Sequence, residues 1–382
     1  MSRLELQDSG VIFRNPLPGH RVINAFYPDL VPLAEDQWLC VLRVGGALYS
    51  PDGVLELFRS SDRGATWVRE GPILDRSRDS APHNDIEGRL TVLRDGSLLL
   101  RVSRADVSDP QRLMYNDRTQ GLVPFLVGTT RSTDGGRTWS DLVMADTQGP
   151  FAPSIMPAPY GRILETRPDG SWMLNFETWK SYDNDGPFDL QMYALFSRDE
   201  GRSWGEKITV ANGSAQGKSF SHGAPIQLED GRFFISSWCA EPKLQGYFGN
   251  YVVTSTDASG RKWNDPVPTG IPGQTSHAAD LGQGRLVLVY SHREDTAQPG
   301  IKVVRSEDGG RTFDREDPLV VWDAYGKEAL GVARTDTYPS SHDAIAYGAP
   351  QIVRLDGSRA LVSFWCTQGA DTHCRWGLVG AG

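Results

Sequence analysis

Short runs of apolar and β-branched residues, separated by turn-forming residues, recur along the whole chain. Pairs of such runs, each joined by a short turn rich in Asp and Gly, cover residues 90–93 and 97–102, 163–166 and 171–176, 225–228 and 232–238, and 351–354 and 358–365. A single run, 285–290, follows the turn at Gly282 and Gly284, and a looser pair covers 27–33 and 37–43. Asp-Gly between apolar runs is typical of a β-hairpin. The pattern predicts a chain built from short antiparallel strands.

The motif Ser-x-Asp-x-Gly-x-x-aromatic alternates with these hairpins. Its copies begin at Ser60, Ser132, Ser197, Ser255 and Ser306, and the copy at Ser255 carries one extra residue. The aspartates of successive copies are 72, 65, 58 and 51 residues apart. In such a motif Asp accepts hydrogen bonds from the backbone ahead of it, and Gly supplies a positive φ. We therefore interpret these aspartates as turn-forming rather than catalytic.

Together the two repeats divide the chain into six units of four strands each. Four-stranded units that repeat in this way are typical of the blades of a β-propeller. The sixth unit has no Asp motif after residues 374–379. A propeller must close its ring to remove exposed strand edges, so we expect residues 10–14 to supply the outer strand of the last blade. The fold class predicted is all-β: a six-bladed β-propeller of four-stranded antiparallel blades, closed by an N-terminal strand, with residues 1–382 as a single domain.

The Asp motifs, their spacing and the six units resemble the sialidase (neuraminidase) superfamily over essentially the whole chain. The resemblance implies a six-bladed propeller with a carbohydrate-binding pocket at the centre of the ring. It does not by itself imply sialidase activity, because similar propellers carry arabinanases, polysaccharide lyases and non-enzymatic modules.

Composition narrows the classes of partner. The net charge is −9 and the pI is about 5.3, with no basic stripe of the kind that binds nucleic acid. The four cysteines fit no zinc-binding spacing, and we expect neither a metal nor a cofactor. No apolar run approaches the length of a membrane span, and the N-terminus lacks the apolar core of a signal peptide. We expect a cytoplasmic protein whose partner is a saccharide.

Ionisable and aromatic side chains gather where the first strand of each predicted unit begins and where the second strand ends. In a propeller these positions face the central channel. Burying such groups without a role costs free energy, so their density favours a functional pocket. The substrate-binding residues predicted in this way are Tyr27, Asp29, Arg43, Glu87, Arg104, Arg162, His222, His277 and His292. Loops 106–122, 182–188 and 322–344 are expected to roof the pocket.

The resemblance also implies catalytic roles. Sialidases use a Tyr nucleophile paired with a Glu, an Asp acid/base, and three Arg that bind the sialic acid carboxylate. Tyr347 stands at the position of the nucleophile, Glu241 at that of its partner, and Asp52 at that of the acid/base. The arginines have no counterpart: an aromatic residue, Asn250 and Pro299 stand in their places. Bidentate binding of a carboxylate requires Arg, so the resemblance favours a hydrolase other than a strict sialidase.

A second arrangement pairs Glu177 with Glu241, which end the second strands of neighbouring units. Two carboxylates that flank a glycosidic bond are the minimum for acid/base hydrolysis, and the pair resembles that of sialidase-fold exo-arabinanases. The main prediction is therefore an exo-acting glycoside hydrolase with Asp52, Glu177, Glu241 and Tyr347 as catalytic residues. Two alternatives remain open: a uronate-directed lyase that uses His222, His277 and Tyr347, and a sugar-binding propeller without catalysis.

Overall fold

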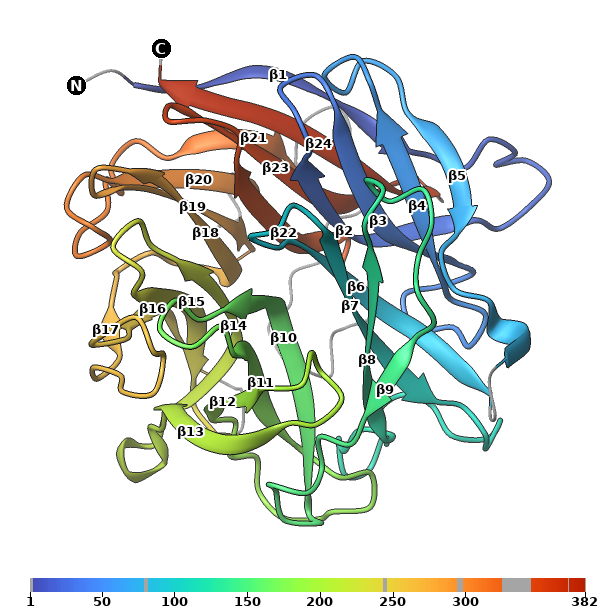
Figure 1. Cartoon of the computed structure of the whole chain (residues 1–382), viewed down its shortest axis with the longest axis vertical. Coiled ribbons are helices and arrows are strands. Elements are labelled where there is room, and N and C mark those ends of the chain that lie inside the picture. The colour runs from blue at the N-terminus through green and yellow to red at the C-terminus, as the bar shows by residue number, and fades with distance from the viewer. Residues whose placement is uncertain are drawn as a thin grey trace.

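The computed structural model of this chain describes residues 3–78, 82–242, 246–293, 298–324, 345–369 and 371–381. Within these residues, six four-stranded sheets surround a common centre (Figure 1). Every pair of neighbouring strands in these sheets is antiparallel. The prediction of an all-β, six-bladed β-propeller is confirmed.

Each blade runs from an inner strand beside the central axis to an outer strand at the rim. The first blade consists of β2 (Asn24–Pro32), β3 (Trp38–Gly45), β4 (Val54–Ser60) and β5 (Val68–Pro72). The second consists of β6 (His83–Val92), β7 (Leu98–Asp106), β8 (Phe125–Ser132) and β9 (Val143–Ala145). The third consists of β10 (Ile155–Glu165), β11 (Trp172–Lys180), β12 (Met192–Ser197) and β13 (Gly205–Ala211). The next two are β14 (Ser219–Gln227), β15 (Phe233–Ala240), β16 (Tyr247–Thr254) and β17 (Val267–Pro268); and β18 (Gln274–Gly282), β19 (Arg285–His292), β20 (Gly300–Ser306) and β21 (Leu319–Asp323).

The sixth blade joins the two ends of the chain. It consists of β22 (Tyr347–Arg354), β23 (Arg359–Gln368), β24 (Asp371–Ala381) and, as its outer strand, β1 (Leu4–Phe13). The predicted closure by an N-terminal strand is therefore confirmed, and the strand begins earlier than the expected residues 10–14. Two short 3-10 turns, η1 (Arg76–Arg78) and η2 (Ser214–Gln216), interrupt the connections. Across the described ranges, no helix has both the length and the apolar character needed to cross a bilayer.

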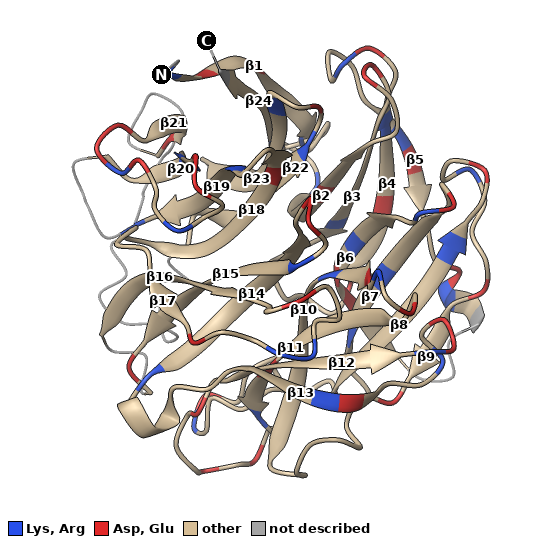
Figure 2. Cartoon of the chain, turned by 60° about the vertical axis from the view of Figure 1, so that its left-hand side comes forward, with Lys and Arg blue, Asp and Glu red and all other residues tan. Residues whose placement is uncertain are grey.

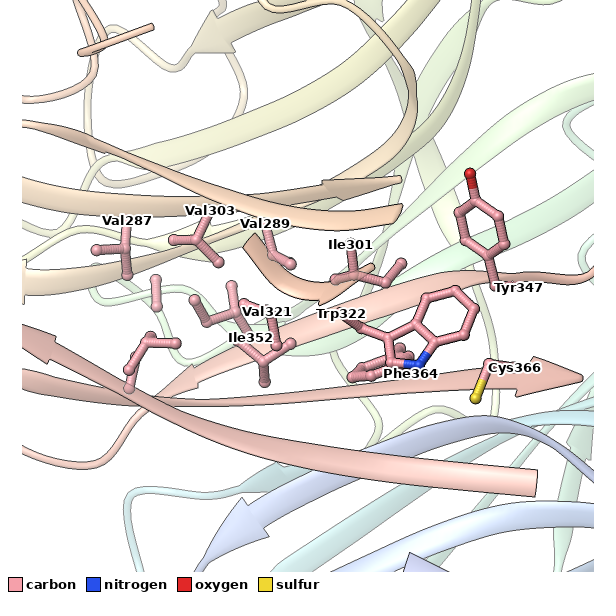
Figure 3. Packing of buried hydrophobic residues seen from close by; sticks show 14 of the residues in the cluster. Val287, Val289, Ile301, Val303, Val321, Trp322, Tyr347, Ile352, Phe364 and Cys366 are labelled. Atoms are coloured by element: carbon pink, nitrogen blue, oxygen red, sulfur yellow. The ribbon is translucent and has the colours of Figure 1, made fainter. Parts of the chain in front are cut away.

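The blades stack face to face, so their second strands are buried on both sides. All described positions of β3, β11 and β15 are buried, whereas β5 and β17 at the rim are largely exposed. Figure 3 shows one such interface, where Val289 and Ile301 of the fifth blade pack against Ile352 and Phe364 of the sixth. Burial of this apolar surface is the main force that holds neighbouring blades together.

The Asp motifs form tight turns between the third and fourth strands. In the copy that begins at Ser132, the serine hydroxyl donates to Asp134 and accepts from the Gly136 amide, and Asp134 also accepts from the amide and hydroxyl of Thr138. The hydroxyl and amide of Thr138 hold the pKa of Asp134 well below its usual range. These hydrogen bonds support the interpretation that the aspartates form turns.

All six inner strands are irregular. Each pairing between an inner strand and the second strand of its blade contains a register shift of the β-bulge type. In or beside these shifts Tyr27, His222, Thr275 and Ala349 have positive φ angles of 52°, 56°, 33° and 46°. Bulges redirect side chains and are frequent next to active sites. Here they turn the side chains of several blades toward the same end of the channel.

Candidate functional site

A cavity of about 120 Å³ lies at the end of the channel where the inner strands begin, and we call it the central cavity. Aromatic rings form much of its wall: Tyr27, Tyr49, Tyr115, Phe125, Tyr160, Trp179, Trp238 and Trp365. Its ionisable side chains, among the described residues, are Glu87, Glu177, His222 and Arg293 in addition to the tyrosines. Apolar walls with a few convergent polar groups are the usual lining of a ligand site.

Glu177 is the carboxylate whose environment is most unusual. It lies in β11, is only 4% exposed, and accepts hydrogen bonds at Oε2 from the Ser221 hydroxyl (2.6 Å) and the His222 amide (2.8 Å). Among the described residues no Lys or Arg forms a salt bridge with it. Burial raises the pKa of Glu177 to about 7, and the nearby Glu87 contributes to the rise. Glu177 can therefore hold a proton near neutral pH and donate it to a bound molecule.

The bulge in β14 places His222 beside Glu177 and fixes its orientation. Its ring stacks on Tyr160 with 4.7 Å between the ring centroids, and Trp238 Nε1 donates to His222 Nδ1 at 3.1 Å. Burial lowers the pKa of His222 to about 4, so the ring is neutral at neutral pH. Since an indole N–H can only donate, Nδ1 is the acceptor and Nε2 carries the proton. His222 is thus a hydrogen-bond donor at Nε2.

Glu87 is the second carboxylate of the central cavity. It lies in β6 and pairs with two fully buried guanidinium groups, those of Arg89 (2.7 Å) and Arg101. Figure 2 shows charged segments within β6 and β7 as well as on the loops. Glu87 and Glu177 therefore lie in contrasting environments, the one ion-paired and the other without a cationic partner among the described residues. Such a contrast is how two carboxylates take different roles in one site.

Four of the residues expected from the sequence line this cavity: Tyr27, Glu87, Glu177 and His222. The Tyr27 hydroxyl lies 3.1 Å from that of Tyr49, and burial raises the pKa of Tyr27 well above its ordinary value.

The expected roof over the pocket is formed in part by loop 106–122, which contributes lining residues. Most of the expected roof loop 322–344, namely residues 325–344, lies outside the described residues.

Three expected residues lie at the other end of the channel, which corrects the prediction that they share the pocket. Arg162 and His277 line a separate cavity of about 590 Å³, here called the opposite cavity. Asp29 is fully buried, pairs with Arg162 at 2.8 Å and accepts from the Leu90 amide. His277 Nδ1 accepts from the Ile352 amide. Successive positions of a strand differ by about 3.3 Å in height, so residues past the bulge reach the opposite end.

Three more expected residues are bonded within the blades or their loops and are not among the described residues that line the central cavity. The buried Arg43 guanidinium donates to the carbonyl oxygens of Ala47 (2.6 Å) and Ser50 (2.6 Å), and Arg104 pairs with Asp85 at 2.8 Å. Asp52 binds the Gly46 amide and the Ser50 hydroxyl within the same loop. Although burial opposes it, these hydrogen bonds lower the pKa of Asp52. An acid/base needs to reach substrate, and Asp52 is not among the described residues that line the central cavity.

The remaining three expected residues, Tyr347, Glu241 and His292, also lie outside the cavity lining. Tyr347 is 1% exposed and packs against Trp322, and its hydroxyl donates to the backbone oxygen of His292 at 2.6 Å (Figure 3). The His292 ring is buried at the end of β19. The side chain of Glu241 is exposed after the end of β15, and its amide donates to the Gly246 oxygen. Among the described residues, Glu177 therefore shares the central cavity with Glu87 rather than with Glu241.

The structure also brings in residues that the sequence reasoning missed. Tyr49 and Tyr115 line the cavity from loops, and Gln274 and Thr275 line it from β18; Arg293, which the sequence offered only as a possible substitute for a sialidase arginine, also lines it. Arg293 donates to Gln274 at 2.8 Å, and its guanidinium lies over the Tyr347 ring. Arg293 directly follows the expected His292, which ends the second strand of the fifth blade. The sequence therefore indicated the correct strand end, but the residue that lines the cavity is the next one along. Nothing in the sequence pattern pointed to Tyr49 and Tyr115, because residues in loops follow no periodicity that predicts which way their side chains face.

No three His, Cys, Asp or Glu side chains come together as a possible metal site in the part of the chain that the structure describes. The four cysteines are buried as free thiols.

No family model and no curated protein sequence matches this chain. Solved structures do match. A protein of unknown function from Dyadobacter fermentans is similar over 99% of both chains, with a TM-score of 0.72 and 20% identity. An α-L-arabinanase from Penicillium chrysogenum, complexed with arabinobiose, is similar over 97% of both chains, with a TM-score of 0.63 and 16% identity. The Hadza microbial sialidase Hz136 matches 92% of this chain and 65% of its own, with a TM-score of 0.59 and 16% identity.

At these identities the likeness concerns the fold. The described residues form six blades, and the chain matches glycoside hydrolases of the sialidase-like type almost from end to end. The chain therefore has the sialidase-like six-bladed β-propeller fold.

Proposed function

We propose that this protein is an exo-acting glycoside hydrolase that binds one terminal sugar in the central cavity, with Glu177 as the proton donor. The observation that carries the proposal is the pKa of Glu177, which burial raises to about 7 in a cavity walled by aromatic rings. A general acid works best when its pKa lies near the working pH. The volume of about 120 Å³ suits a single sugar ring better than an extended chain.

Three of the cavity's polar groups, Glu177, Glu87 and His222, have a role in this reaction. Glu177 donates its proton to the glycosidic oxygen as the bond from that oxygen to the anomeric carbon breaks. Glu87, held by Arg89 and Arg101, stabilises the positive charge that develops on the sugar. A water molecule then adds to the anomeric carbon and returns a proton to Glu177. His222 donates from Nε2 to a sugar oxygen.

The charges of the cavity favour a sugar without a carboxylate. Arg293 is the one cationic side chain among the described residues that line it, and that guanidinium already donates to Gln274. Asn250, which stands at the place of a sialidase Arg, is buried and donates to the Gly273 oxygen at 3.1 Å. A sialic acid carboxylate would therefore lack its bidentate partners. This supports a hydrolase of neutral sugars.

The arrangement gives less support to a lyase. That reaction would require His222, His277 and Tyr347 around one substrate, but His277 lines the opposite cavity and the Tyr347 hydroxyl is bonded to the His292 oxygen. The protonated Nε2 of His222 is a donor and cannot accept a proton from a sugar carbon.

The test is a product assay by mass spectrometry in isotopically labelled water. The protein is incubated with oligosaccharides that end in different neutral sugars, with sialosides, and with uronate-containing glycans. We expect release of a neutral monosaccharide carrying the label at its anomeric carbon. We also expect kcat to fall above about pH 7, where Glu177 loses its proton. Release of sialic acid, an unsaturated uronate, or no product from any glycan would contradict the proposal.

A further inference from the structure

A second hollow opens beside the central cavity, and we call it the outer groove. Its volume is about 700 Å³, and loops 47–51 and 105–117 form most of its wall. The groove and the central cavity share four lining residues: Leu48, Tyr49, Met114 and Tyr115. The two hollows are therefore neighbours, and the side chains of these residues form the wall between them.

Aromatic contacts hold this wall in place. The Tyr49 and Tyr115 rings meet edge to face with 5.5 Å between centroids, and Tyr115 meets Trp179 in the same way at 5.8 Å. Trp179 Nε1 donates to the Gln120 oxygen, and the Leu122 amide donates to the Lys180 oxygen. Loop 106–122 is thus fastened to the third blade, and the groove is part of the folded structure.

The surface of the groove is apolar where it is free to meet a ligand. Val107, Pro110, Leu113 and Met114 line it, and Leu113 is 64% exposed. Two of its three described carboxylates, Asp106, Asp109 and Asp117, bind the loop itself: Asp106 accepts from the Ser108 amide at 2.8 Å, and Asp109 accepts from the Gln111 amide at 3.0 Å. Apolar side chains that gather in one hollow, rather than standing singly on the surface, are a mark of a binding surface.

We infer that the outer groove binds the leaving group of the substrate, and that this leaving group is an apolar aglycone, aromatic or alkyl, rather than a second sugar. The inference rests on the proposed function, since it places the sugar in the central cavity. A glycosidic bond that passes beside Tyr49 and Tyr115, which line both hollows, would put the sugar into the central cavity and the leaving group into the outer groove. A second sugar would need hydrogen-bonding partners for its hydroxyls, whereas the groove offers mainly apolar contacts.

The first experiment does not depend on catalysis. Binding of para-nitrophenol to the whole chain is measured by isothermal titration calorimetry for wild type, Leu113→Asp and Val68→Asp. Val68 is the matched control, since it is also 64% exposed but lies on β5 at the rim. We expect Leu113→Asp to weaken binding by about tenfold, because a charge replaces an apolar contact, and Val68→Asp to leave it unchanged. Absence of binding to wild type, or equal binding by all three, would overturn the inference.

The second experiment separates this inference from the proposed function. The para-nitrophenyl and methyl glycosides of a panel of neutral sugars are compared as substrates. We expect Leu113→Asp to lower kcat/KM for the nitrophenyl glycoside alone. If Leu113→Asp lowered kcat/KM equally for both glycosides, the inference about the outer groove would be wrong, whereas the proposed hydrolase function would be unaffected. Binding of para-nitrophenol that depends on Leu113, without cleavage of any glycoside, would support the groove and overturn the hydrolase. Leu113→Ser, which adds no charge, serves if the Asp variant does not fold.

Discussion

The two ends of the central channel contain the same kinds of residue but differ in how those residues are partnered. At the opposite cavity, Asp29 is bound by Arg162 and by the Leu90 amide, and His277 accepts from the Ile352 amide. At the central cavity, Glu177 has a hydroxyl and an amide as partners and no described cation, and His222 keeps its Nε2 proton. Both ends contain a buried carboxylate beside a histidine, which is buried in the case of His277 and partly buried in that of His222.

The pKa values reflect the difference in partners. Although burial opposes it, Arg162 and Arg89 hold the pKa of Asp29 below its ordinary value, whereas burial raises that of Glu177 to about 7. A carboxylate paired with Arg stays an anion, whereas one buried without a cation can hold a proton at neutral pH. The comparison teaches that the partner, more than the residue type or its burial, decides which carboxylate of this channel can act as a proton donor.

The sharpest test of the comparison is Glu177→Gln. Gln keeps the size of the side chain but holds no transferable proton, so we expect the rate of hydrolysis to fall by about 10²- to 10⁴-fold. The measurement is kcat on the best substrate from the product assay. Glu165→Gln is the control, since Glu165 ends the inner strand β10 of the same blade and accepts from the Arg94 amide. A similar loss in both variants would show that Glu177 is not special.

Glu241→Gln tests the pairing predicted from the sequence against the one in the structure. The Glu241 side chain is exposed and Glu87 lines the cavity, so we expect kcat to stay within about twofold of wild type. The same kinetic assay measures it. A loss as large as that of Glu177→Gln would restore Glu241 as the catalytic partner and reject Glu87.

At the opposite end, we expect Asp29→Ala to lower the free energy of unfolding by about 3–5 kcal/mol, because it leaves the buried Arg162 guanidinium without its anion. Urea-induced unfolding measures the change. Combining it with Arg162→Met removes the unpaired charge and is expected to recover part of the loss. If Asp29→Ala instead left stability intact and abolished hydrolysis, the opposite cavity rather than the central cavity would be the catalytic one.

The pH dependence of stability distinguishes the two carboxylates. The folded-state pKa of Glu177 is about 7, against an ordinary value of 4.5, so the folded protein holds a proton that the unfolded chain releases. Stability from this group is therefore present below pH 4.5 and is lost as the pH rises to about 7, a change of about 3 kcal/mol. We expect Glu177→Gln to gain stability over wild type by that amount between about pH 4 and pH 8 in urea unfolding. A constant difference across this range would contradict the raised pKa.

Trp238→Phe is expected to have a smaller effect than Glu177→Gln. The change removes the N–H that donates to His222 Nδ1, a hydrogen bond worth about 1 kcal/mol, and frees the ring to exchange its tautomer. We expect KM to rise by about fivefold with little change in kcat. Nitrogen NMR of His222 follows the tautomer directly. An unchanged Nε2 proton signal would show that Trp238 does not set it.

The repeated turns and apolar runs determined the architecture from the sequence alone. The motifs at Ser60 and Ser306 and the Asp-Gly hairpins depend on contacts between residues close in the chain, so their spacing was enough to predict six blades and the closing strand. Glu177 and His222 were also found in this way, because both stand at strand positions that the repeat predicts to face the channel.

Only the tertiary structure decided which polar residues meet in the cavity. Bulges shift the register of every inner strand, so Asp29 and His277 fall at one end while Tyr27 and His222 turn toward the other. The partners that set each pKa come from other blades, as Arg162 does for Asp29 across 133 residues of sequence. The local sequence around a residue does not predict such distant contacts. These contacts determine whether a buried carboxylate is ionised or protonated at neutral pH.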